Sequence, residues 1–167
     1  PISIAAPVFW EDLDIGARLG RGSSGHVHRG LWRAQKVSKP ISVAVRLTPT
    51  TALQLARGVA SATAHLHSKG LLHGDLYAHN VLWDGQNGDA VLSDFGAASV
   101  LPVGEEGSLW QRTEVRAWGL LLGELLERCA GASAELVKLQ DLVHACVQPH
   151  TASRPSMADV AEFLSDM

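Results

Sequence analysis

The spacing of hydrophobic and polar positions changes once along the chain, from strand-like to helix-like. Apolar residues alternate with polar ones from Ile15 to Leu19, just before a cluster of glycines. Residues 27–32 predict a strand that returns after this cluster, and the β-branched run at 41–45 predicts a third strand. The first part of the chain is therefore expected to form a small sheet.

The rest of the chain is expected to be mostly helical, because its apolar residues recur three and four positions apart. The predicted helices cover residues 51–68, 114–129, 134–146 and 156–164. Gly70 follows the first of them, as a C-terminal glycine should, and residues 90–92 predict one short strand. A small sheet before a helical block predicts an α+β fold, with one domain over residues 1–167. Its sheet part spans about residues 10–48 and its helical part about residues 51–167.

The composition is that of a globular protein, with 46% hydrophobic and 19% charged residues among 167. The net charge of −3 gives no sign of nucleic-acid binding. Cys129 and Cys146 form no CxxC pair and are interpreted as thiols in a reducing, cytoplasmic compartment. No signal peptide is evident. The most apolar stretch, residues 118–126, is short and contains Glu124, so no membrane span is expected.

Two polar clusters carry candidate chemistry. In the stretch HGDLYAHN at 73–80, Asp75 and Asn80 lie five positions apart after a predicted helix. Phosphoryl transfer uses a carboxylate that accepts a hydroxyl proton and a neutral oxygen that binds a metal. Asp94 follows the predicted strand at 90–92, and a second carboxylate would suit Mg²⁺. Either cluster alone is equally typical of a solvated turn.

Taken together, the clusters resemble the HRDxxxxN and DFG motifs of the protein kinase family, in the same order and at nearly the same spacing. The stretch GRGSSGHV at 20–27 resembles the family's glycine-rich loop, whose backbone N–H groups approach phosphates without Cβ clashes. The EVRAWG stretch at 114–119 is similar to DVWSFG, and RPS at 154–156 to a late kinase segment. The resemblance extends over residues 15–164.

This resemblance implies a two-lobed kinase-like fold, with a reduced N-terminal sheet and a helical C-terminal lobe around an ATP–Mg²⁺ cleft. It implies transfer of the γ-phosphate of ATP to a hydroxyl group of a protein substrate. Asp75 would be the catalytic base, and Asn80 and Asp94 would bind Mg²⁺. The residues expected to contact the nucleotide are Gly20, Gly22 and Gly25 over the phosphates, and Val27, Ala44 and Leu82 around the adenine.

The chain departs from the family pattern at Arg46, which stands where the family has a phosphate-binding lysine. Arginine keeps the charge but is bulkier and planar, so impaired activity is expected. A solvated strand end is the alternative reading of Arg46. Only four residues separate Arg46 from the predicted helix at 51–68, and no acidic residue occurs between Arg46 and Gly70. The family's helix with its partner glutamate is therefore missing. One explanation is a degenerate or deleted kinase. The other is a sequence that joins two ordered segments directly, although a further stretch lies between them in the protein.

Further departures concern regulation. Gly74 replaces the arginine of HRD, which senses phosphate on the activation loop in the family. No Ala-Pro-Glu follows Asp94, so the partner of Arg154 is left open. Regulation by loop phosphorylation is expected to be absent. A phosphomimetic substitution at Ser108 or Thr113 that switched activity would contradict this expectation.

Several functional alternatives stay open at this point. The HGDxxxxN form also resembles small-molecule phosphotransferases that act on aminoglycosides or choline. A non-catalytic pseudokinase module is the other alternative, favoured by Arg46 and the missing segment. Tyr77 and Ala78 match neither the serine/threonine nor the tyrosine kinase signature, so the acceptor type is open. A zinc site among the eight histidines is disfavoured by their spacing.

Overall fold

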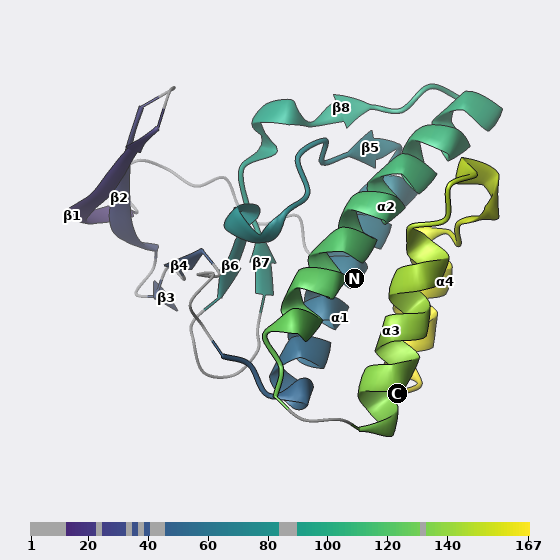
Figure 1. The fold of residues 1–167 in the computed structure, drawn as a ribbon. Coiled ribbons are helices and arrows are strands. Elements are labelled where there is room, and N and C mark those ends of the chain that lie inside the picture. The colour runs from purple at the N-terminus through teal and green to yellow at the C-terminus, as the bar shows by residue number, and fades with distance from the viewer. Residues whose placement is uncertain are drawn as a thin grey trace. The chain divides into compact units, whose positions relative to one another are not determined.

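The computed structural model describes residues 13–22, 25–32, 35–36, 39–40, 46–83, 90–130 and 133–167. Side chains are described from residue 46 onward, and before that only for Ala17 and Arg18. The chain forms two compact units, Pro1–Ser38 and Lys39–Met167. Both units appear in Figure 1.

The first unit is a three-stranded antiparallel sheet in the order β1-β2-β3. Its strands are β1 (Leu13–Gly22), β2 (Gly25–Trp32) and β3 (Gln35–Lys36). The predicted pair of strands around the glycine cluster is thus confirmed. The glycines lie within the strand ends, because Gly22 pairs with Gly25 at the tip of the hairpin. The strand predicted at 41–45, which includes Ala44, lies outside the described residues.

Two small sheets in the second unit flank the loop at 73–80. One has the order β4-β6-β7, and in the other β5 pairs with β8. The strands are β4 (Lys39–Pro40), β5 (Leu71–Leu72), β6 (Val81–Trp83), β7 (Ala90–Leu92) and β8 (Ser99–Val100). The short strand predicted at 90–92 is therefore confirmed. The loop begins after β5 and ends in the short helix η2 (Ala78–Asn80) before β6, so both of its ends are held by strands.

The helices of this unit match the predicted order. They are α1 (Pro49–Ser68), α2 (Glu105–Glu127), α3 (Ala134–Cys146) and α4 (Met157–Ser165). The α2 helix begins well before the predicted start at residue 114. Of residues 105–113 only Gly107 is buried, so no apolar stripe marks this part of the helix. Glu105 and Glu106 in the first turn favour the helix through its dipole.

The chain passes directly from Arg46 into α1. The Leu47 N–H donates to the carbonyl of Arg128 at 3.1 Å, and Leu47 forms a β-bridge with Cys129 at the end of α2. The Thr48 side chain caps α1 by accepting from the backbone N–H of Thr51. The connection is thus a short, hydrogen-bonded one, and the additional helix and strands of the kinase pattern have no place between Arg46 and α1.

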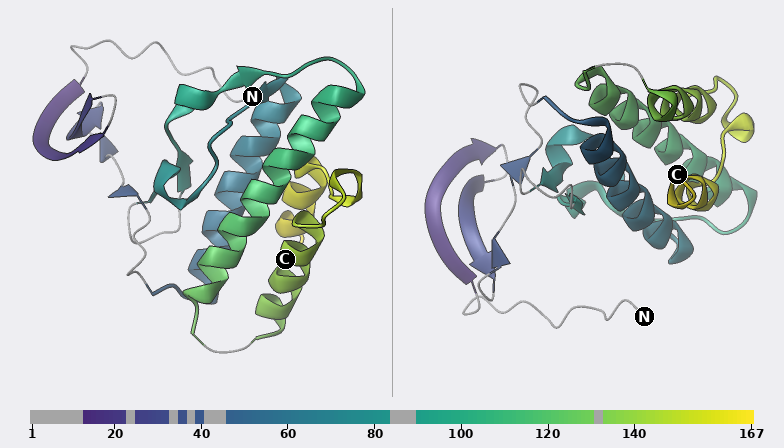
Figure 2. Two further views of the ribbon diagram at one scale, coloured as in Figure 1. Left: turned by 45° about the horizontal axis from the view of Figure 1, so that its top comes forward. Right: turned by 90° about the horizontal axis from the view of Figure 1, so that it is seen from below.

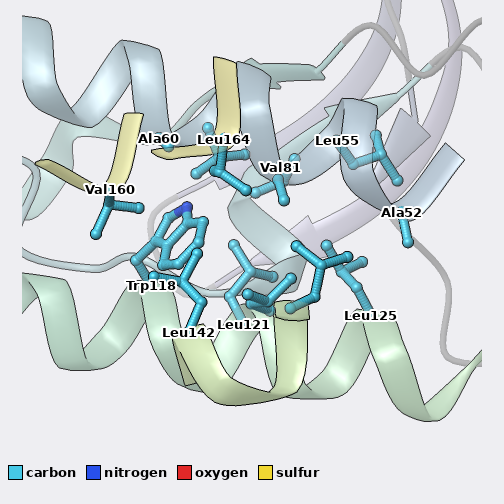
Figure 3. Close-up of a cluster of buried hydrophobic side chains, with 14 of the residues drawn as sticks. Ala52, Leu55, Ala60, Val81, Trp118, Leu121, Leu125, Leu142, Val160 and Leu164 are labelled. Carbon is cyan, nitrogen blue, oxygen red and sulfur yellow. The ribbon is translucent and has the colours of Figure 1, made fainter. Parts of the chain in front are cut away.

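The hydrophobic core lies between α1 and α2, which run antiparallel, with α3 and α4 packed beside them (Figures 1 and 2). Figure 3 shows the fully buried Trp118 of α2 among side chains from α1, α3 and α4. Helices α2 and α3 approach closely at Gly119, where a Cβ would lie 2.6 Å from the Cβ of Cys146. Burial of a leucine or valine side chain stabilises the fold by about 1.5–3 kcal/mol. The core therefore gives the loop at 73–80 a rigid base.

Cys129 and Cys146 are both free thiols, and Cys146 is fully buried. Burial raises the pKa of Cys146 to about 12, so its thiol stays protonated and unreactive. Within the described part of the chain, no helix combines the length and the apolar character that crossing a membrane requires.

Candidate active site

The loop at 73–80 is anchored by Glu114 of α2. Its Oε1 accepts from the backbone N–H of Gly74 at 2.7 Å, and its Oε2 accepts from the backbone N–H of His73 at 3.3 Å. Nε2 of His67, in the last turn of α1, lies 2.9 Å from the same Oε2. A single buried carboxylate thus joins α1, α2 and the start of the loop.

The surroundings of Glu114 keep it charged. Burial raises the pKa of its carboxyl. The hydrogen bonds from His67, Gly74 and His73, together with the electrostatic effect of His67, lower the pKa by a larger amount. The net result is a pKa below the ordinary value. A charged acceptor makes stronger hydrogen bonds than a neutral one, so the loop backbone is held firmly.

His73 links the loop to the strand before Asp94. Its side chain is fully buried, and Nε2 lies 2.9 Å from the carbonyl oxygen of Ser93. The imidazole also packs edge-on against the ring of Phe95, with 4.8 Å between the ring centroids. These contacts give His73 a packing and hydrogen-bonding role.

Asn80 orients Asp75. The amide Nδ2 of the buried Asn80 donates to the Asp75 carbonyl at 2.8 Å and to its carboxylate Oδ2 at 3.0 Å. Asp75 itself is exposed, so its carboxylate is fixed on one side and open to solvent on the other. Since both described side-chain contacts use the amide nitrogen Nδ2, the side-chain oxygen Oδ1 of Asn80 is the group that can bind a cation.

Ser93 connects the segment that contains Asp94 to Asn80. The backbone N–H and the hydroxyl of Ser93 both donate to the backbone carbonyl of Asn80, at 2.8 and 2.9 Å. Asp94 follows with φ 61° and ψ 74°, and is the non-glycine residue with positive φ in the described part of the chain. This left-handed conformation costs roughly 1–2 kcal/mol, a kind of strain that often accompanies functional positions. Its carboxylate accepts from the Gly96 N–H at 3.2 Å and remains exposed.

The oxygen groups at this site are of the kind that a magnesium ion takes when it is bound together with a phosphate. Magnesium usually takes only one or two carboxylates from a protein and completes its shell with phosphate oxygens and water. In the described part of the chain, no group of three or more His, Cys, Asp or Glu side chains could hold a metal ion. The Asp94 carboxylate and the side-chain oxygen Oδ1 of Asn80 are hard ligands of the kind that Mg²⁺ prefers.

The other predicted site residues belong to other parts of the chain. Leu82 lies in β6, two residues after Asn80, and is half-buried. Arg46 is exposed just before α1, and its side chain makes no ion pair with the described residues. The remaining predicted nucleotide contacts, Gly20, Gly22, Gly25 and Val27, belong to β1 and β2 of the first unit, whereas Ala44 lies outside the described residues.

Gly74 occupies a position that only glycine fits. Its φ is +81°, and a Cβ there would collide with the carbonyl oxygen of Ala97 in the segment after Asp94. A side chain at this position would clash, and glycine stands here in place of the arginine of the family motif.

Arg154, whose partner the sequence leaves open, is buried and donates to backbone carbonyls. Its Nε donates to Gln148 at 2.8 Å, and its terminal nitrogens donate to Arg112 at 3.1 Å and to Pro149 at 3.3 Å. Arg112 donates in return to the carbonyl of Arg154. The arginine thus ties the segment before α4 to α2, which is a structural role.

Sequence reasoning assigned no role to Glu114, His67 or Ser93. One signal was available for Glu114, because it is a charged residue on a helix face that continues with the buried Val115 and Trp118. Ser93 carried no signal, since its role rests on backbone contacts with residues far away in the sequence.

The family model described as protein kinase domain matches residues 32–118, which is more than half of the chain. The chain belongs to the protein kinase family. It is a shortened member, because the catalytic loop at 73–80 and the Asp94-Phe95-Gly96 segment are present while the segment between Arg46 and α1 is missing. The α+β fold with small sheets and a helical block agrees with a reduced kinase fold.

Relatives of known name are also kinases or kinase-like proteins. A serine/threonine-protein kinase US3 homolog of bovine herpesvirus 1.2 is 39% identical over 72 residues, covering 43% of this chain and 13% of that protein. The rat dual specificity testis-specific protein kinase 1 is 30% identical over 128 residues, covering 62% and 19%. The human kinase suppressor of Ras 2 is 41% identical over 54 residues, covering 32% and 6%. This chain therefore spans less than a fifth of the length of each of these relatives.

Proposed function

We propose that this protein is an ATP-dependent protein kinase, which moves the γ-phosphate of Mg-ATP to a hydroxyl group of a protein substrate at a reduced rate. The observation that carries the proposal is the hydrogen-bonded chain from Asp75 through Asn80 and Ser93 to Asp94. It connects a candidate base and two candidate metal ligands within one rigid part of the fold. Membership of a family that generally uses ATP and Mg²⁺ supports the same proposal.

In this proposal each residue has one task. Asp75 accepts the proton of the substrate hydroxyl, since its carboxylate is exposed and already oriented by Asn80. Asn80 and Asp94 hold the magnesium ion, which when bound neutralises negative charge on the phosphates. Anchoring by Glu114 keeps the loop backbone in place while the nucleotide and the substrate exchange.

The reduced rate follows from Arg46 and the shortened chain. In this family a lysine and its partner glutamate position the α- and β-phosphates. Arg46 is bulkier than lysine, and no acidic residue follows it before Gly70. The same observation favours a second candidate function, a nucleotide-binding module without phosphotransfer activity.

Substitution of Asp94 by alanine is expected to remove the magnesium-dependent part of ATP binding, because the exposed carboxylate is the only charged ligand proposed for the ion. Calorimetric titration with ATP, in Mg²⁺ and again in EDTA, measures this part directly. The matched control is Asp141→Ala, an exposed aspartate on α3. Equal affinity for Mg-ATP in the Asp94→Ala variant and the wild type would refute the metal role.

Assays of phosphate transfer separate the candidate functions. Transfer to protein substrates supports the kinase proposal. Binding of Mg-ATP, seen as a raised melting temperature, without any transfer supports the binding module. Transfer to a small alcohol such as choline, but not to protein, would instead support a small-molecule phosphotransferase.

A further inference from the structure

A cavity of about 420 Å³ lies on the side of the loop at 73–80 that faces α2. Its walls come from β5, the loop, β8 with the segment that follows it, and the N-terminal half of α2. The described lining residues are Leu72, Gly74, Leu76, Ser99, Val100, Pro102, Trp110, Thr113, Glu114 and Ala117. The volume lies within the range of small-molecule sites, which is roughly 300–1,000 Å³.

The cavity has an apolar body and an open apolar mouth. Leu72, Leu76 and Ala117 provide aliphatic walls, and the aromatic ring of Trp110 is half exposed. Val100 is 79% exposed beside it. A short connection, residues 101–104, leads from β8 into α2, and its Pro102 forms part of the wall. Concave apolar surface with an aromatic rim is typical of ligand sites.

The charged group in the described lining of the cavity is acidic. Glu114 is the charged residue among the described lining residues, and its surroundings hold its pKa below the ordinary value. Glu106 lies on the same face of α2 as Trp110, Thr113 and Ala117, because these positions follow the i, i+4, i+7, i+11 spacing of a helix. The described lining contains no lysine or arginine. The field in the cavity therefore favours a cation and disfavours an anion.

We propose that this cavity is a binding site for a small amphipathic cation, with an aromatic or aliphatic body and one ammonium group. The body fills the space between Leu72, Leu76 and Ala117. The ammonium group lies towards the acidic face of α2, where Trp110 adds a cation–π contact. The proposal goes beyond the phosphotransfer function and does not depend on it.

Such a ligand would act on the catalytic loop. Gly74 and Leu76 line the cavity and flank Asp75, whose side chain is held from the other side by Asn80. A ligand in the cavity would therefore contact the two residues next to the proposed base, and through them it would affect the position of Asp75.

The test uses tryptamine as the cationic probe, with 3-methylindole and indole-3-propionate as its neutral and anionic counterparts. Titration of the ¹⁵N-labelled protein is followed by NMR. Tryptamine is expected to bind saturably and to shift the amide signals of Gly74, Leu76 and Val100. The neutral and anionic counterparts are expected to bind at least tenfold more weakly.

Two variants locate the site. Thr113→Lys places a positive charge in the lining, whereas Leu120→Lys places the same charge at an exposed position of α2 outside the lining. Thr113→Lys is expected to weaken tryptamine binding at least tenfold and Leu120→Lys to leave it unchanged, with melting temperatures showing that both fold. Absence of saturable binding, equal binding of indole-3-propionate, or equal effects of the two variants would each overturn the proposal.

Discussion

Replacement of Glu114 by alanine is expected to lower the free energy of unfolding by about 3–5 kcal/mol, because its carboxylate accepts three hydrogen bonds and each hydrogen bond to a charged group contributes about 1.5–3 kcal/mol. The carboxylate accepts from two backbone N–H groups and from His67, and it is only 6% exposed. Alanine leaves all three groups without this acceptor. Chemical denaturation followed by circular dichroism measures the loss.

The matched control for this prediction lies on the same helix. Glu124 pairs with Arg128 at 3.7 Å, but its side chain is 51% exposed. An exposed i, i+4 pair contributes about 0.3–0.5 kcal/mol, so Glu124→Ala should change stability little. Equal losses in the two variants would show that the Glu114 contacts do not anchor the loop.

The pH dependence of stability gives the same pair of variants a second readout. The pKa of Glu114 is lower in the folded protein than its ordinary value of 4.5. The unfolded chain therefore binds a proton on this group more readily than the folded one. The stabilisation is present above about pH 4.5 and is lost as the pH falls below that value. The difference between the wild type and Glu114→Ala is expected to shrink over that acidic range.

Substitution of Asp75 by asparagine is expected to lower the rate of phosphate transfer by about 10²–10⁴-fold, the usual contribution of a general base. Asparagine has nearly the same shape and keeps an oxygen that can accept from Asn80, so the loop should hold its conformation. Affinity for Mg-ATP and the melting temperature should therefore stay near the wild-type values. The measurement is transfer of radiolabelled γ-phosphate from ATP to a general protein substrate.

The control for this prediction distinguishes loss of the Asp75 carboxylate from a general disturbance of the loop. Tyr77→Phe changes an exposed neighbour in the same loop and keeps its ring contact with His79. It is expected to retain most of the activity. A wild type that transfers phosphate no faster than Asp75→Asn, while both bind Mg-ATP, would support the non-catalytic module instead.

Local patterns made the fold largely predictable. The bounds of α3 were predicted as they are, because Ser133 caps a helix with a regular apolar stripe. The predicted start of α2, residue 114, was wrong. Of residues 105–113 only Gly107 is buried, so hydrophobic periodicity gives no sign of a helix there. The strand at 90–92 was found from three residues because it precedes Asp94 in a recognisable motif.

The candidate site was predictable where it is contiguous in sequence. Asp75 and Asn80 form a local unit, and their hydrogen bond spans five positions. The Glu114 anchor spans forty positions, and the chain offers no periodic signal for such a contact. The carbonyl partners of Arg154 were equally hidden, because backbone acceptors occur at every residue and carry no sequence signature. Long-range polar contacts therefore require the folded structure.

The central claim is that Asn80 and Asp94 form the metal-binding end of a nucleotide site. Mn²⁺ accepts the same oxygen ligands as Mg²⁺, and its unpaired electrons broaden the NMR signals of nearby nuclei. In the presence of Mn-ATP, the amide signals of Asn80, Val81, Asp94 and Phe95 are expected to broaden, whereas those of α4 stay sharp. A spectrum in which these four signals stay sharp at saturating Mn-ATP, or in which broadening centres on other residues, would contradict the claim.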